Sequence, residues 1–122
     1  MRIVISSIGD TLDSDVDTRF GRCKYFLIVE TENKEIKNFS AVQNEGVLQG
    51  HGAGIRAAEQ IGELKPDAVI TGNLGPNASN VLSQLKVQVY HGSGKVNTTI
   101  AAFLEGKLQR LTEISRAHSG MR

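Results

Sequence analysis

The sequence predicts an α/β fold in three layers, a mixed five-stranded sheet with helices packed on it. Two observations lead to this fold class. Short apolar or β-branched runs, typical of buried strands, occur from the N-terminus onward, and in the second half they alternate with segments whose apolar residues recur at helical spacing. The predicted order of elements is therefore β-β-β-α-β-α-β-α.

The first three elements are expected to be strands at residues 3–5, 25–29 and 36–42. The first two are continuous apolar runs, as in strands that are buried on both faces of a sheet. The third mixes Phe39 with polar neighbours, as a half-exposed strand does. Because residues 32–34 offer a turn, the second and third strands should form an antiparallel hairpin.

The second half of the chain is expected to alternate helices with strands. A helix from Gly54 should place small and apolar residues on one face until Pro66 ends it. A strand follows at 68–70, and Pro76 suits the first position of the next helix, where no amide donor is lost. Val87 and Val89 belong to an edge strand, and a last helix begins near Val96 and ends near Gly106.

Right-handed crossovers then give the strand order 3-2-1-4-5 with the second strand antiparallel to its neighbours, which is the ribonuclease-H-like arrangement. A single domain is expected at residues 1–108. Residues 109–122 are expected to be a flexible C-terminal tail, because the sequence from 112 onward has little to bury.

Composition limits the classes of partner. The 122 residues include 14 Lys+Arg and 13 Asp+Glu, for a net charge of +1, so neither nucleic acid nor an anionic membrane is an expected partner. The apolar run at the N-terminus is too short for a signal peptide or a membrane span, which predicts a cytoplasmic protein. A chain of this length needs no cofactor to fold, and its single cysteine excludes an internal disulfide or a four-cysteine cluster site.

Two similar stretches indicate a binding edge: His-Gly-Ala-Gly at residues 51–54 and His-Gly-Ser-Gly at residues 91–94, each where a strand is expected to give way to a helix. In open α/β sheets, ligands favour the crevice beyond the carboxyl ends of the strands. We expect Cys23, His51 and His91 to face that crevice. Imidazole suits iron, copper or zinc, and the cations beside Cys23 should lower the pKa of its thiol and favour the metal-binding thiolate.

A purely structural role for the same glycines and for Cys23 also stays open. Glycines in such loops also serve only to make tight turns and to let helices pack closely. A lone cysteine in an intracellular protein is commonly a small buried hydrophobe.

The sequence gives less support to a calcium site, a Walker nucleotide site, a nuclease or another enzyme. The acidic stretch at residues 10–17 does not continue as a calcium loop, because Thr18 and Lys24 stand where glycine and glutamate are required, so a solvated loop is favoured. Gly94-Lys95 lacks the rest of a Walker motif. A two-metal nuclease needs carboxylates on central strands, and residues 3–5 carry none. No patterned nucleophile and base are found, so we do not expect an enzyme.

Three motifs together resemble the dinitrogenase iron-molybdenum cofactor biosynthesis family, which includes NifX- and NafY-type carriers and the carboxy-terminal domain of NifB. They are Phe-Gly-Arg-Cys-Lys-Tyr-Phe at 20–26, Gly-His-Gly-Ala-Gly-Ile at 50–55 and Thr-Gly-Asn-Leu-Gly-Pro-Asn-Ala at 71–78. Within the family the chain resembles a small standalone archaeal member of uncharacterised function. The resemblance implies a ribonuclease-H-like fold and a surface that holds a metallocluster.

The resemblance also implies which residues form that surface. Cys23, His51 and His91 would be metal ligands, and charge or backbone donors would come from Arg22, Gly52, Gly54, Gly72 and Gly75. The predicted function is thus a non-catalytic, monomeric binding or carrier protein for an iron-sulfur or iron-molybdenum cofactor precursor, exchanging cargo with donor or acceptor proteins. The alternative is a regulatory module that binds a small anion or nucleotide through the glycine-rich loops.

Overall fold

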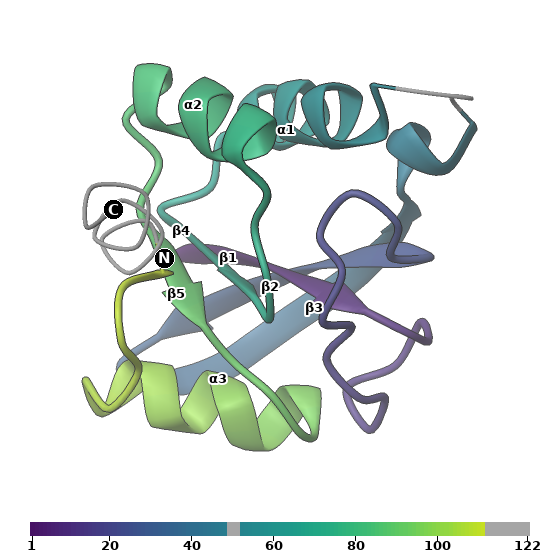
Figure 1. Cartoon of the computed structure of the whole chain (residues 1–122). Coiled ribbons are helices and arrows are strands. Elements are labelled where there is room, and N and C mark those ends of the chain that lie inside the picture. The colour runs from purple at the N-terminus through teal and green to yellow at the C-terminus, as the bar shows by residue number, and fades with distance from the viewer. Residues whose placement is uncertain (49–51, 112–122) are drawn as a thin grey trace.

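The computed structural model describes residues 1–48 and 52–111. The chain forms, in order, β1 (Arg2–Ser7), β2 (Tyr25–Glu32), β3 (Glu35–Gln43), the 3₁₀ helix η1 (Glu45–Leu48), α1 (Ala53–Leu64), β4 (Ala68–Thr71), α2 (Pro76–Gln84), β5 (Val89–His91) and α3 (Val96–Leu104). The sheet lies between α1 and α2 on one side and α3 on the other (Figure 1). The predicted α/β class and the order of strands and helices are therefore confirmed.

The sheet has five strands in the order β3-β2-β1-β4-β5. β2 runs antiparallel to both β1 and β3, whereas β4 is parallel to β1 and to β5. The predicted strand order and the antiparallel second strand are thus confirmed, and the ribonuclease-H-like label stays a prediction. The short helix η1, which the sequence analysis did not predict, links β3 to the segment before α1.

The central strand β1 shows why its sequence is apolar without alternation. Val4 packs in the core beneath α1 and α2, whereas Ile3 and Ile5 pack in the core above α3. All three side chains are fully buried. Successive side chains of a strand point to opposite faces, so a strand covered on both faces needs apolar residues at every position.

The hairpin between β2 and β3 closes through Asn33 and Lys34, whose φ angles are 55° and 64°. Glu32 and Glu35 pair on either side of them, so the loop has two residues, both in the left-handed region. This is the type I′ geometry whose twist matches that of paired strands. The turn expected at residues 32–34 is therefore confirmed.

The chain beyond α3 returns to the sheet at β5. His91 N donates a hydrogen bond to Gln109 O at 2.8 Å, and Tyr90 pairs with Arg110 in an antiparallel bridge. Leu111 is buried in the core beneath α1 and α2. Residues 109–111, which the sequence analysis assigned to the tail, thus lie against β5, and the rest of the predicted tail lies outside the described residues.

No helix in the described part of the chain is long and apolar enough to cross a membrane.

The hairpin yields a stability prediction. Lys34→Gly should stabilise the protein by about 0.5 kcal/mol, because a left-handed conformation costs about 1–2 kcal/mol for a residue with a Cβ, and part of this gain is offset by the flexibility of glycine in the unfolded chain. Urea unfolding would measure the change. Lys37→Gly, within β3, is the control and should destabilise the protein by about 0.5–1 kcal/mol. Equal losses in both variants would contradict the turn assignment.

Candidate functional site

A pocket of about 430 Å³ opens where α1 and α2 begin. Three segments line it: residues 19–22 ahead of β2, residues 52–55 at the start of α1, and residues 73 and 75–78 at the start of α2. Of the predicted site residues, the lining includes Arg22, Gly52, Gly54 and Gly75. Cys23, Gly72 and His91 do not line it.

Both helices present an uncapped N-terminus to this pocket. Gly52 is the N-cap of α1, with a φ of 76° that favours glycine, and Gly75 is the N-cap of α2. Among residues 1–48 and 52–111, neither helix has a side-chain cap hydrogen bond at its N-terminus, and the first turn of each lines the pocket. The amides of a first helical turn have no partner within the helix and carry partial positive charge, so the two ends together favour an anion.

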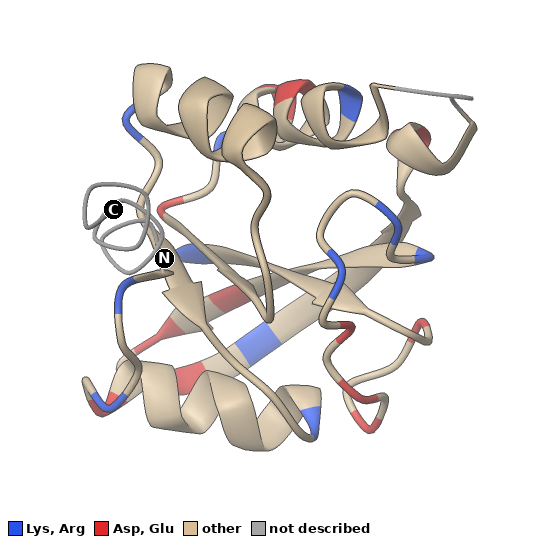
Figure 2. Ribbon diagram, in the orientation of Figure 1, with Lys and Arg blue, Asp and Glu red and all other residues tan. Residues whose placement is uncertain are grey.

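Arg19 and Arg22 place guanidinium groups on the facing wall. Figure 2 shows basic positions along the second half of the loop between β1 and β2, after an acidic first half. Buried Asp17 accepts hydrogen bonds from Arg19 Nε and Nη2, both at 3.2 Å, and from Arg19 N at 2.9 Å. Burial opposes ionisation of Asp17, but these bonds outweigh it and lower its pKa. Asp17 thus orients Arg19, whereas exposed Arg22 has no ion-pair partner among the described residues.

Close backbone contacts hold the walls together. A Cβ on Gly21 would lie 3.0 Å from the Cα of Gly54, so the turn before β2 touches the first turn of α1. A Cβ on buried Gly72 would lie 2.5 Å from the Cα of Thr18. Gly72, predicted as a binding residue, therefore lies behind the pocket and lets the loop that carries Arg19 approach the end of β4.

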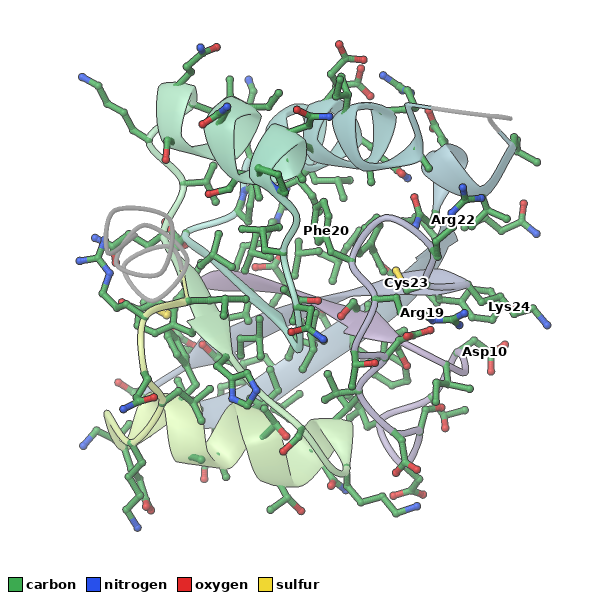
Figure 3. All side chains as sticks on the ribbon, in the orientation of Figure 1. Asp10, Arg19, Phe20, Arg22, Cys23 and Lys24 are labelled. Atoms are coloured by element: carbon green, nitrogen blue, oxygen red, sulfur yellow. The ribbon has the colours of Figure 1, made fainter. Side chains whose placement is uncertain are left out.

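Cys23 is fully buried in the core cluster that includes Phe20 and Phe26. Its Sγ donates to Phe20 O at 3.4 Å, and Asn44 Nδ2 lies 3.5 Å from the sulfur. Figure 3 shows the sulfur inside the fold, whereas Lys24 reaches away from it.

Burial, assisted by the negative charge of Asp17, raises the pKa of Cys23 to about 12. The expectation that neighbouring cations lower this pKa is therefore wrong, because desolvation dominates once the sulfur is buried. In the described conformation the group is a neutral thiol.

The second His-Gly-x-Gly stretch differs from the first in its surroundings. His91 is exposed at the end of β5. The first amides of α3 are already used, because Val96 N donates to Ser14 O at 2.9 Å and Asn97 N donates to Leu12 O at 3.0 Å. The loop after β1 thus caps the N-terminus of α3, whereas the N-termini of α1 and α2 face the pocket.

His51 lies outside the described residues, so its predicted place at the crevice stays a prediction. Within residues 1–48 and 52–111, no group of three or more His, Cys, Asp or Glu side chains is arranged to hold a metal ion.

Sequence analysis missed several residues of the pocket wall, chiefly Arg19, Ala53, Ile55 and Asn77. All are within or beside the three motifs that carried the family resemblance, and that position is the one signal that could have identified them. No pattern in the sequence could have identified the buried Asn44, whose contacts join segments far apart in the chain.

A family model described as dinitrogenase iron-molybdenum cofactor matches residues 1–106. An uncharacterized protein of Methanocaldococcus jannaschii, MJ0580, is 38% identical over 116 residues, which cover 90% of this chain and 95% of the relative.

Solved structures agree in fold. The apo form of the orange protein from Desulfovibrio gigas superposes with a TM-score of 0.79 at 29% identity, covering 89% of this chain and 91% of the other. A putative NifB protein from Thermotoga superposes with a TM-score of 0.76 at 36% identity, covering 91% and 93%.

Two glycines of the β4–α2 loop should respond differently to a methyl group. Gly72→Ala should destabilise the protein by about 1–3 kcal/mol, because the new Cβ would meet the backbone of Thr18. Gly75→Ala is the matched control and should change stability by about 0.5 kcal/mol or less, since its φ of −70° is ordinary and a Cβ there meets nothing within 4 Å. Urea unfolding distinguishes them, and similar losses would argue against the close approach at Gly72.

The buried thiol predicts a loss of stability in alkali. The folded-state pKa of Cys23 is raised from 9.0 to about 12, so its contribution is complete below pH 9 and is lost as the pH rises toward 12. Chemical unfolding across this range should show a steeper decline for the native protein than for Cys23→Ala, which removes the thiol while leaving the tyrosines and lysines. Parallel declines for the two proteins would refute the raised pKa.

Proposed function

Because the chain belongs to the dinitrogenase iron-molybdenum cofactor family, we propose that it is a non-catalytic carrier that binds an iron-sulfur or iron-molybdenum cofactor precursor. It would act as a monomer in the cytoplasm and exchange this cargo with donor or acceptor proteins. The observation that carries the choice of site is the pocket between the uncapped starts of α1 and α2 and the Arg19–Arg22 turn.

The chemistry of this pocket suits a metal-sulfur cluster. Concave arrays of backbone amides are used for phosphate and for iron-sulfur sites, and hydrogen bonds to cluster sulfur atoms tune such clusters. A volume of about 430 Å³ lies within the usual size of small-molecule sites. Binding through amides and guanidinium groups, with few covalent ligands, also suits a protein that must release its cargo.

The proposed metal ligands are Cys23, His51 and His91. His51 is the first choice because it directly precedes Gly52, which lines the pocket. Ligation by Cys23 would require its thiol to lose a proton and to leave the contact with Phe20, which fits a ligand recruited only when cargo arrives. His91 is the weakest candidate, since the lining does not include it.

The same open amides also favour a second candidate, a regulatory module that binds a small anion or nucleotide. In that case nucleotides should shift the amide resonances of Gly52–Ile55 and Gly72–Asn77 without any metal. A cluster carrier should instead show such shifts only after reconstitution.

Anaerobic reconstitution with iron and sulfide, and separately with molybdate added, tests the carrier proposal. We expect a visible chromophore at near-stoichiometric metal, weakened in His51→Ala and in Cys23→Ala. A colourless, metal-free protein after both treatments would exclude the carrier function.

Gly75→Asp tests the pocket itself. An aspartate at this N-cap should cap α2 and place a carboxylate among the amides, so the protein should remain as stable as the native chain or gain about 0.5 kcal/mol, while cargo uptake falls at least about tenfold. Asn80→Asp, on an exposed part of α2 outside the lining, carries the same change of charge and should leave uptake unchanged. Equal uptake by both variants would place the cargo elsewhere.

A further inference from the structure

Asn44 connects two walls of the pocket: the turn at Phe20–Cys23 and, through η1, the start of α1. It follows β3 and is 2% exposed, so its side-chain bonds are shielded from water. Asn44 Nδ2 donates to Cys23 O at 3.0 Å and to Phe20 O at 3.3 Å, while Asn44 Oδ1 accepts from Gly46 N at 2.8 Å. One amide thus binds the turn that carries Arg22 and also binds η1.

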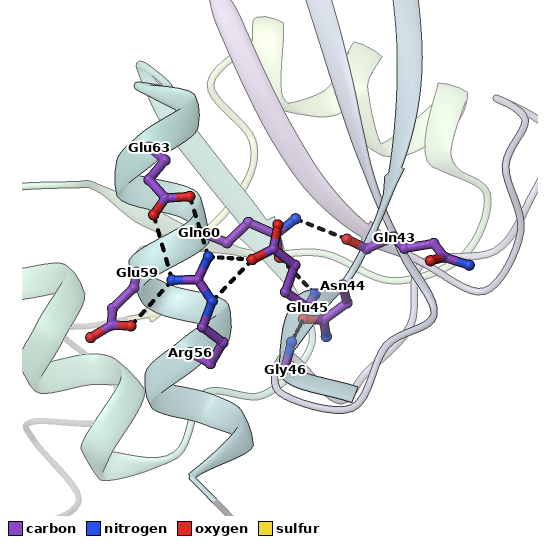
Figure 4. Close-up of polar contacts among 8 residues, drawn as sticks. All are labelled: Gln43, Asn44, Glu45, Gly46, Arg56, Glu59, Gln60 and Glu63. Atoms are coloured by element: carbon purple, nitrogen blue, oxygen red, sulfur yellow. Dashed lines mark hydrogen bonds and ion pairs between the residues drawn. The ribbon is translucent and has the colours of Figure 1, made fainter. Parts of the chain in front are cut away.

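η1 in turn abuts the start of α1. A Cβ on Gly46 would collide with Ala53 O, the carbonyl of the first residue of α1. Gln60 and Arg56, both on α1, hold η1 as well: Gln60 Oε1 accepts from Glu45 N at 2.9 Å, and Arg56 pairs with Glu45, as Figure 4 shows. The contact between η1 and α1 is therefore secured by several side chains.

Apart from the close contact of Gly21 with Gly54 and a backbone bridge from Arg19 to Asn73, fewer side-chain bonds hold the arginine-bearing turn than hold η1. Among the described residues, Asn44 is the one side chain from outside the turn that donates to the carbonyls of Phe20 and Cys23. Its own backbone N also donates to Lys24 O at 3.1 Å. Loss of the side-chain amide would remove the donor to Cys23 O and leave Phe20 O with the weak Cys23 thiol donor, which is a costly state that the turn can relieve by moving.

We propose that Asn44 is a positioning residue that fixes the Phe20–Cys23 turn, and with it Arg22, at a set distance from the start of α1. Calling the result a cargo site rests on the proposed function, whereas the positioning of the turn does not. Asn44 is not itself a lining residue, and it acts on the pocket through the turn, to whose lining residue Phe20 it donates.

Amide hydrogen exchange tests the positioning without any cargo. The Arg22 amide, which donates to Arg19 O within the turn, should exchange about tenfold faster in Asn44→Ala, once each rate is compared with the protein's own global unfolding. Gln60→Ala is the matched control, because it also removes a buried amide that bonds near η1 but does not contact the turn. Its Arg22 exchange should stay within about twofold of the native rate.

The same variants also test whether Asn44 affects cargo binding. After anaerobic reconstitution with iron and sulfide, Asn44→Ala should retain about tenfold less cluster than Gln60→Ala at matched stability. If Asn44→Ala does not fold, Asn44→Ser, whose hydroxyl can supply one donor, should show the same changes at smaller size.

Equal Arg22 exchange in Asn44→Ala and Gln60→Ala would overturn the positioning role. Faster exchange in Asn44→Ala without selective loss of cluster would overturn its importance for binding. If the native protein takes up no cluster, the carrier function fails, and the exchange result still decides whether Asn44 positions the turn.

Discussion

Parallel pairing of β1 with β4 and of β4 with β5 is the constraint on which the rest of the structure depends. Parallel strands cannot be joined by a tight turn, so the chain returns through α1 before β4 and through α2 before β5. The helices α1, α2 and α3 start at the same edge of the sheet, because each follows a strand that ends there, namely β3, β4 and β5. Whether such a start can bind a ligand then depends on what covers it, and the loop after β1 covers α3 while leaving α1 and α2 open.

The architecture could be predicted from sequence because burial on both faces leaves a local signature. Residues 3–5 and 25–29 are apolar at every position, and Pro76 marks a helix start by its own covalent geometry. The capping of the α3 N-terminus by the loop after β1 leaves no such signature in the sequence. Its acceptors are backbone carbonyls of Leu12 and Ser14, and any residue type can supply a carbonyl. The repeated His-Gly-x-Gly thus predicted two similar helix starts, which differ through a tertiary contact.

The candidate site, like the fold, could be predicted from sequence only in part. Arg22, Gly52, Gly54 and Gly75 were predicted and line the pocket, because motif residues at helix starts and strand ends gather at one edge. The pKa of Cys23 could not be predicted from its neighbours in sequence. Arg22 and Lys24 are exposed, whereas the sulfur is buried, so desolvation outweighs their charge. Proximity along the chain indicates charge, and only the fold determines solvation.

The burial of Leu111 bears on the size of the folding unit. The family match ends at residue 106, yet Leu111 fills part of the core beneath α1 and α2, and Gln109 O accepts a bond from the edge of β5. A chain stopped at the family boundary would leave an unfilled apolar cavity and an unpaired strand edge, the two features that promote association through exposed β-structure. The fold therefore uses residues 109–111, which lie beyond the segment that the family model matches.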